Sequence, residues 1–235
     1  MTSLTSLSHQ HRQALMSNPW FAGLPEVARD DILARVRSRA LGPGQRLFSR
    51  GEASDGVYGV LEGAIRVSGV SREGRVTVLD FYGPGSWIGE VSTLEGSPRI
   101  HDADAHGAIL VMHLAAAEFE DLLTVHPSLS RALLRLEAQR LRILLSALEL
   151  YSASSLEARL ASRLLMLAGS FGVSTPQGLK LDFQLPQETL AQLTGLTRQR
   201  VNQIFKTWES NGVIEQSYGR IVMIDRAKLE EIAQP

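Results

Sequence analysis

The chain has 235 residues, 44% of them hydrophobic, and a formal net charge of −1 at pH 7, a composition typical of a globular protein with a sizeable core. It contains no cysteine, which excludes disulfides, thiolate zinc sites, cysteine nucleophiles and cysteine-held iron–sulfur clusters. No run approaches the roughly 18 consecutive apolar residues of a membrane span, and the first residues lack the order of a signal peptide. We therefore expect a cytoplasmic protein with no membrane partner.

The first half of the chain has the pattern of short strands. A segment with helical apolar spacing, Val27 to Val36, precedes residues 41–114, in which glycines separate short alternating apolar runs such as Ile65–Val67 and Val76–Val78. Alternation broken by glycine turns predicts short antiparallel strands. Several such strands at close spacing predict a small barrel or roll.

A long helix is predicted from Pro127 to about Tyr151, since this segment contains no glycine and no further proline. Leucines recur along it every seven residues, with two more beside them: Leu134, Leu141, Leu148, Leu144 and Leu145. A heptad stripe predicts a partner helix, and the simplest partner is a second copy of the chain. The alternative is that this stripe packs on the roll.

Residues 186–209 have the pattern of a helix–turn–helix. Pro186 suits the first turn of a helix, and Ala191 is small where two helices would cross closely. Gly195 can adopt the left-handed conformation of the turn, and Thr197 is a good N-cap for the second helix. The alternative is a helical hairpin used for protein contacts.

The second of these helices carries residue types that read DNA. Between Thr197 and Trp208 the chain has basic residues and no acidic ones, so positive charge is concentrated here. Arginine pairs with guanine, and glutamine or asparagine pairs with adenine. The candidate DNA-binding residues of this helix are Thr197, Arg198, Gln199, Asn202, Gln203 and Lys206. Beyond it, Val213–Glu215 and Ile221–Ile224 flank Tyr218-Gly219-Arg220, which predicts a two-stranded wing with Arg220 as a phosphate contact.

Taken together, a glycine-punctuated roll, a long helix and a winged helix–turn–helix resemble the cyclic-AMP receptor/fumarate-nitrate regulator (Crp/Fnr) family of bacteria. The resemblance implies an α+β fold. Its parts would be an effector-sensing β-roll of the cyclic-nucleotide-binding type (residues 1–126), a dimerisation helix (127–152) and a DNA-binding domain (153–235). The implied function is a homodimeric transcription regulator without enzymatic activity or catalytic residues. Its implied partners are a pseudo-palindromic DNA duplex and RNA polymerase.

The family's phosphate-binding cassette is visible from Trp87 to Arg99. A Gly89-Glu90 turn can present backbone N–H groups, and Arg99 follows nine residues after the glutamate. The resemblance implies that Glu90 binds a ribose hydroxyl and Arg99 a cyclic phosphate, with cyclic AMP or cyclic GMP as the effector.

The cassette also departs from the bacterial cyclic-AMP receptor. Ile100 replaces a serine that helps to hold the phosphate, and His101 replaces a small residue. Leu144 and Leu145 replace hydroxyl side chains expected near the adenine; they suit either a purine cover or a dimer contact. A ligand-independent regulator, with Ile100 and His101 filling the pocket, therefore stays open.

The recognition helix departs as well. Arg198 matches a base-reading arginine of the cyclic-AMP receptor, but Gln199 stands where that protein has glutamate and Gln203 where it has arginine. Glutamate accepts a hydrogen bond from cytosine, whereas glutamine pairs preferentially with adenine. We therefore expect a DNA half-site that differs from that of the cyclic-AMP receptor.

Two further alternatives use histidines. A haem sensor would draw axial ligands from His101, His106, His113 and His126. A metal-dependent enzyme on a β-barrel would combine His101, His106 and His113 with Asp102, Asp104 or Glu90. Their spacing matches no compact ligand motif, so we expect no metal site.

Overall fold

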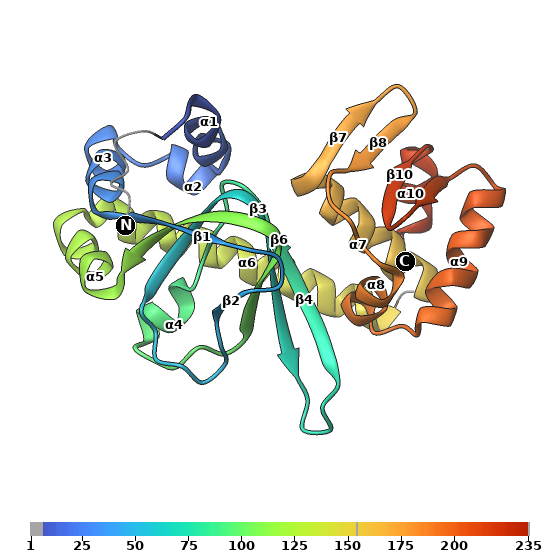
Figure 1. Ribbon diagram of the computed structural model, residues 1–235, viewed down its shortest axis with the longest axis horizontal. Coiled ribbons are helices and arrows are strands. Elements are labelled where there is room, and N and C mark those ends of the chain that lie inside the picture. Colours follow the sequence, from blue (N-terminus) through green and yellow to red (C-terminus); the bar gives the residue numbers. More distant parts are fainter. Residues whose placement is uncertain (1–6, 154, 235) are drawn as a thin grey trace. The chain divides into compact units, whose positions relative to one another are not determined.

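The computed structural model describes residues 7–153 and 155–234, except for the side chains of residues 147–153. Figure 1 shows the order of the elements along the chain. Contacts divide the chain into a first unit, residues 1–69 and 80–142, and a second unit, residues 70–79 and 143–235. No helix in the described ranges is long and apolar enough to cross a membrane.

The first unit contains an antiparallel sheet with helices around it. Its helices are α1 (His9–Ser17), α2 (Pro19–Ala22), α3 (Glu26–Arg35), α4 (Glu90–Glu95) and α5 (Ala116–Val125). The strands of the sheet are β1 (Arg37–Leu41), β2 (Arg46–Phe48), β3 (Gly56–Val70), β4 (Val76–Tyr82), β5 (Trp87–Ile88) and β6 (Asp102–Ala115). The strand order is β1-β6-β3-β4, with β2 paired to β6 and β5 paired to β3. The predicted antiparallel roll is therefore confirmed.

Two apolar clusters stabilise this unit. The first cluster lies within the sheet and includes the fully buried Val60 and Ile65 of β3 and Ala103 and Val111 of β6. A second cluster joins the helices to the sheet through Phe21, Ile32, Trp87 and Leu129, among others. Each fully buried large apolar side chain contributes about 1.5–3 kcal/mol to folding.

The long helix α6 (Pro127–Ala153) has the predicted extent. Leu129 and Leu133 are buried in the second cluster, whereas Leu134 and Leu141 are 73% and 55% exposed. The heptad stripe therefore does not pack on the roll at these positions. The side chain of Leu148 lies outside the described residues.

The second unit combines helices with a small antiparallel sheet. The helices are α7 (Leu156–Phe171), α8 (Gln187–Thr194), α9 (Arg198–Ser210) and α10 (Arg226–Ile232). The strands are β7 (Gly172–Thr175), β8 (Gly178–Leu181), β9 (Ile214–Ser217) and β10 (Arg220–Met223), in the order β7-β8-β10-β9.

The wing belongs to a larger sheet. Strand β7 pairs with β8, and β8 pairs in turn with β10 of the wing. The β7 segment lacks clear apolar alternation, so the backbone pairing that makes it a strand comes from its neighbours in the sheet.

Candidate effector site and DNA interface

The cassette is built around a glycine at the start of a short helix. Gly89 follows β5, has φ +91° and forms the N-cap of α4. A Cβ at this position would lie 2.5 Å from Nη1 of Arg99 and 3.1 Å from the carbonyl oxygen of Gly56. Only glycine permits this conformation and this close approach.

Arg99, the residue expected to bind phosphate, is 2% exposed and already has internal acceptors. Its Nη1 donates to the carbonyl of Gly89 over 2.8 Å, and its Nη2 donates to the carbonyl of Gly56 over 2.6 Å and to Asp55 Oδ1 over 2.7 Å. The ring of Phe48 lies 4.3 Å from the guanidinium carbon, a cation–π contact. An anionic ligand would therefore have to share or replace the partners of these two nitrogens, whereas the buried Nε has no hydrogen-bond partner within the described residues.

Asp55 is the carboxylate that faces this arginine. The hydroxyl of Tyr58 donates to Asp55 Oδ2, and the ring of His113 stacks on Tyr58 with centroids 4.7 Å apart. Burial acts to raise the pKa of Asp55, but the hydrogen bonds from Tyr58 and Arg99 lower it below its ordinary value. Asp55 is consequently an anion at neutral pH.

Glu90, the residue expected to bind a ribose hydroxyl, is 6% exposed and pairs with Arg140 of α6. Arg140 Nη2 also donates to the carbonyl of Trp87 over 2.8 Å, and its Nη1 donates to Glu137 over 3.1 Å. Burial raises the pKa of Glu90, although Arg140 acts in the opposite direction. Within the described residues Glu90 Oε2 has no hydrogen-bond partner, so one acceptor of this buried carboxyl is left unused.

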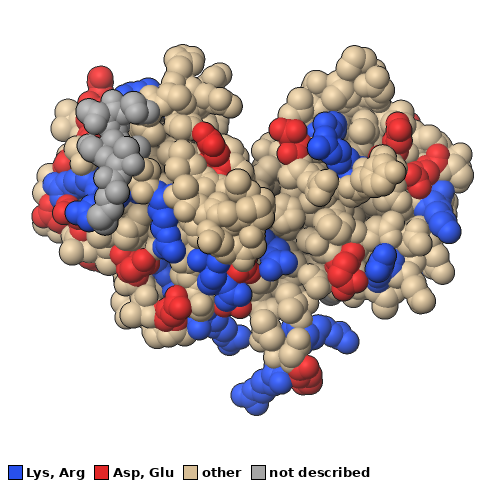
Figure 2. All heavy atoms as spheres, in the orientation of Figure 1, with Lys and Arg blue, Asp and Glu red and all other residues tan. Residues whose placement is uncertain are grey.

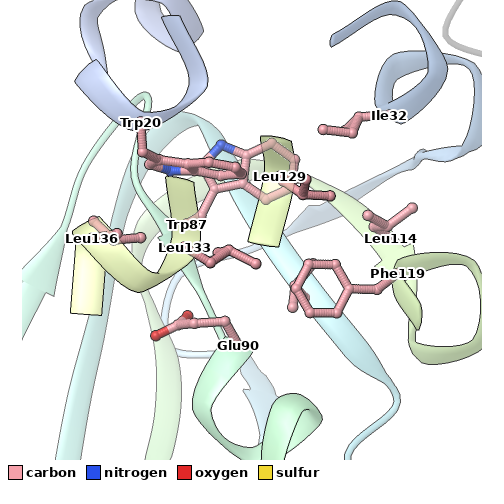
Figure 3. Close-up of a pocket in the computed structure, with 10 residues that line it drawn as sticks. Trp20, Ile32, Trp87, Glu90, Leu114, Phe119, Leu129, Leu133 and Leu136 are labelled. Carbon is pink, nitrogen blue, oxygen red and sulfur yellow. The ribbon is translucent and has the colours of Figure 1, made fainter. Parts of the chain in front are cut away.

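Apolar residues of α6 lie against the same region. Figure 3 shows a pocket in which Glu90 and Trp87 face Leu129, Leu133 and Leu136. Trp20 completes this side of the pocket and contacts Trp87 edge to face, with centroids 5.5 Å apart. The cassette is thus linked to α6 by apolar contact as well as by the Glu90–Arg140 ion pair.

The remaining predicted effector residues are partly or largely exposed. Ile100 is 49% exposed. His101 is half-buried, and burial lowers its pKa. Leu144 and Leu145 on α6 are 57% and 52% exposed.

Sequence reasoning missed several residues of this site. Asp55, Phe48 and Tyr58 lie far from the cassette in the chain and carry no motif. Arg140 was not singled out either, because α6 carries other arginines as well: Arg131, Arg135 and Arg142.

The histidines have structural partners. His106 packs edge-on against Phe81 at 5.0 Å between centroids, and His126 lies 2.9 Å from Asp31 Oδ2. Within the described residues no group of three or more histidine and carboxylate side chains is arranged to hold a metal ion.

The helix–turn–helix has the local geometry that its sequence predicts. Gly195 ends α8 with φ +69°, and the side chain of Thr197 caps α9 by accepting from the amide of Arg200 over 3.2 Å. The helices share a buried core: Leu190, Ala191, Val201, Ile204 and Phe205. This core determines which face of α9 is left for solvent.

That face carries the predicted base-reading residues. Arg198, Gln199, Gln203 and Lys206 are exposed, and Asn202 is half-buried. Arg200 is exposed too, and it donates to Gln203 over 3.4 Å. On the face drawn in Figure 2, basic and acidic side chains are interspersed, which agrees with a net charge of −1.

The wing is present as well. Strands β9 and β10 form an antiparallel hairpin in which Arg220 is opposite Ser217, and Arg220 is exposed at its tip. The wing is thus part of the four-stranded sheet rather than an isolated pair of strands.

Comparisons with known proteins agree with both units. Residues 38–126 match the family model of the cyclic nucleotide-binding domain, and residues 158–232 match the Crp-like helix-turn-helix domain. The chain is 27% identical over 191 residues to the CRP-like cAMP-activated global transcriptional regulator of Mycobacterium tuberculosis, covering 81% of this chain and 85% of that protein. It is 29% identical over 219 residues to the cyclic AMP receptor protein of Thermus thermophilus, covering 93% and 98% respectively.

Solved structures show the same fold. A CRP-family transcriptional regulator from Thermus thermophilus aligns with a TM-score of 0.69 at 26% identity, over 83% of this chain and 96% of that one. FixK2 from Bradyrhizobium japonicum aligns with a TM-score of 0.76 at 20% identity, over 85% and 98%. With the roll, the cassette and the winged helix–turn–helix all in place, the chain belongs to the Crp/Fnr family of DNA-binding transcription regulators.

Proposed function

We propose that this regulator binds DNA as a homodimer whose activity is controlled by a cyclic nucleotide, cyclic AMP or cyclic GMP, in the roll. The observation that carries the effector assignment is the unpartnered Oε2 of Glu90 beside the Gly89 turn. A buried acceptor without a partner costs about 1–3 kcal/mol, and a ribose hydroxyl is a donor that would satisfy it. Arg99 would bind the phosphate, which would replace Asp55 as the partner of the guanidinium.

Arg140 connects this site to α6. Because Arg140 pairs with Glu90 and also donates to the carbonyl of Trp87, a new donor on Glu90 would share with Arg140 the carboxyl group that Arg140 binds. A change at the cassette is thereby transmitted to the helix that carries the exposed leucines.

The homodimer is proposed to form along α6. Its exposed apolar side chains would be covered by a second copy of the same helix: Leu134, Leu141, Ile143, Leu144 and Leu145. Isolated apolar residues are common on surfaces, but a stripe of this length on one helix is typical of an interface. In this proposal Leu144 and Leu145 belong to the dimer contact.

In the DNA complex we assign base contacts to Arg198, Gln199, Asn202 and Gln203 of α9. Phosphate contacts are assigned to Thr197, Lys206 and Arg220. In a dimer the two copies of α9 would enter successive major grooves of a pseudo-palindrome. The proposed division of the chain is sensor 1–126, dimer helix 127–152 and DNA-binding domain 153–235, with RNA polymerase as a further partner on chromosomal DNA in the cytoplasm.

A second candidate is a regulator that needs no ligand. The observation that favours it is that both terminal nitrogens of Arg99 already donate to Asp55, Gly56 and Gly89, and that the Phe48 ring lies over its guanidinium. In this alternative the internal carboxylate takes the place of the phosphate permanently.

One experiment separates these candidates. The purified protein is incubated with a randomised duplex pool, alone, with cyclic AMP and with cyclic GMP, and bound DNA is sequenced. Selection of a palindrome only with a nucleotide supports the gated dimer, whereas equal selection in all arms supports the ligand-independent regulator. Selection of no sequence in any arm contradicts the assignment of α9 as a base-reading helix.

Matched variants test the assigned site. Glu90→Gln should abolish the nucleotide dependence, whereas Glu95→Gln, at an exposed position of the same helix, should leave it unchanged.

A further inference from the structure

The tip of the wing has an unexpected residue for its backbone conformation. Tyr218 and Gly219 form the two-residue connection between β9 and β10, with φ values of +50° and +76°. Positive φ at both central residues is the requirement of a type I′ turn, for which Asn-Gly is the preferred sequence. Tyr218 is the single non-glycine residue with positive φ in the described part of the chain.

Folding does not explain a tyrosine here. Its side chain is 96% exposed, and no hydrogen bond or ring contact of it is present among the described residues. A bulky side chain with positive φ is strained, and an exposed aromatic ring gains nothing from burial. A strained residue whose side chain contributes no contact to the fold indicates a function outside it.

The tip is held in a fixed place beside the helix–turn–helix. The carbonyl of Gly219 accepts from the amide of Leu185 over 2.7 Å, directly before the N-terminus of α8. Gln216 of β9 accepts from the side chain of Gln187 over 3.3 Å, and its amide donates to Glu209 of α9 over 3.1 Å. The wing is therefore tied to both helices of the motif.

We propose that Tyr218 contacts the DNA backbone, with its hydroxyl donating to a phosphate oxygen and its ring lying against the adjacent sugar. In helix–turn–helix proteins the first helix crosses the DNA backbone, so a tip fixed at the N-terminus of α8 lies next to phosphates. Tyrosine is among the side chains that donate to phosphate. This inference rests on the DNA-binding function of the chain and adds a neutral contact beside the cation Arg220.

Charge distinguishes the two contacts. The logarithm of the binding constant falls linearly with the logarithm of the salt concentration. Each cation that neutralises a phosphate makes this slope steeper by about one, and a phenol does not change it. Affinity is measured by fluorescence anisotropy on the duplex that the wild-type protein selects, over a range of salt concentrations. Tyr218→Ala should weaken binding about tenfold with the salt slope unchanged, whereas Arg220→Gln should weaken it and lower the slope by about one.

Stability gives an independent readout. Tyr218→Gly relieves the strain at positive φ, so its melting temperature should rise while its affinity for DNA falls. Asparagine also adopts positive φ readily, so Tyr218→Asn should keep the turn and should also bind DNA more weakly. Val173→Ala, which changes a side chain 47% exposed on β7 at the other edge of the sheet, serves as the control and should bind normally.

The proposal is overturned if Tyr218→Ala and Tyr218→Gly bind the selected duplex as tightly as the wild-type protein. A wild-type protein that selects no duplex would instead contradict the function proposed above.

Discussion

The guanidinium of Arg99 and the carboxylate of Asp55 form an ion pair at 2.7 Å, although the two residues are 44 positions apart in the chain. The carboxylate of Asp55 thus places a negative charge beside Arg99, the residue proposed to bind the phosphate. Under the proposed function, Asp55 would compete with the cyclic phosphate for Arg99.

Asp55→Asn should increase the affinity for cyclic AMP or cyclic GMP. Because the Asp55 side chain is 53% exposed, water screens its pair with Arg99, so removing this charge should tighten binding by a few-fold, corresponding to about 1 kcal/mol or less. Isothermal titration calorimetry measures the change. Asp121→Asn, at an exposed position of α5, is the control. An Asp55→Asn affinity equal to that of the wild-type protein would mean that Asp55 does not oppose the ligand.

The raised pKa of Glu90 predicts a pH dependence of stability. The folded state binds this proton more tightly than the unfolded state, so the stabilisation is fully present below the ordinary pKa of 4.5. It is lost as the pH rises through the higher pKa of the folded state. The free energy of unfolding of the wild-type protein, relative to Glu90→Gln, should therefore fall as the pH is raised from 4.5 toward neutrality.

Urea denaturation at a series of pH values tests this trend. The series begins at pH 4.5 because Asp55 has the opposite behaviour: its lowered pKa gives a stabilisation that is present above the ordinary value of 3.8 and is lost as the pH falls through the lower, folded-state pKa. The difference between the wild-type protein and Glu95→Gln should not vary in this way. If the difference between the wild-type protein and Glu90→Gln is independent of pH, burial does not raise the pKa of Glu90.

Leu141→Asp should convert the proposed dimer to a monomer. A carboxylate at this position would have to lose its water in a helix–helix contact, which is strongly unfavourable without a partner. Multi-angle light scattering after size exclusion gives the mass. Val125→Asp, at a side chain of α5 that is 54% exposed, should leave the mass unchanged. A dimeric Leu141→Asp would place the interface elsewhere.

Gln199→Glu should change the preferred base at one position of each half-site. Glutamine pairs with adenine and glutamate accepts from cytosine, with about 1–3 kcal/mol of discrimination for a good pair. Sequencing of selected duplexes shows the change directly. Gln177→Glu, in the exposed connection between β7 and β8, should select the same DNA as the wild-type protein. Unchanged selection by Gln199→Glu would show that this side chain does not read a base.

Thr197→Ala should destabilise the start of α9. Its side chain accepts from the amide of Arg200, and the loss of an N-cap costs about 1 kcal/mol. Thr207→Ala on the same helix, where the hydroxyl donates to the carbonyl of Gln203, is the comparison and should cost less. Chemical denaturation measures the free energy of unfolding of each variant. Equal decreases for Thr197→Ala and Thr207→Ala would show that the N-cap does not contribute more than an ordinary hydroxyl of the helix.

The sequence alone was sufficient for the parts of this protein that depend on neighbouring residues. Gly195, Thr197 and the apolar spacing of α8 and α9 predicted the helix–turn–helix correctly, because a turn, a cap and a helical face are all determined within a few residues. The long helix α6 and the short strands of the roll were predictable for the same reason, whereas the pairing of β1 with β6 joins distant segments.

The tertiary structure alone decided what surrounds the cassette. Asp55 and Arg140 are 44 and 50 positions from the residues that they contact, and the β7 strand exists because β8 lies beside it. Such contacts depend on how distant segments fold together, and no local period or spacing encodes them. Burying an unpaired charge is strongly unfavourable, so a buried arginine or glutamate pairs with an opposite charge that the fold brings close to it.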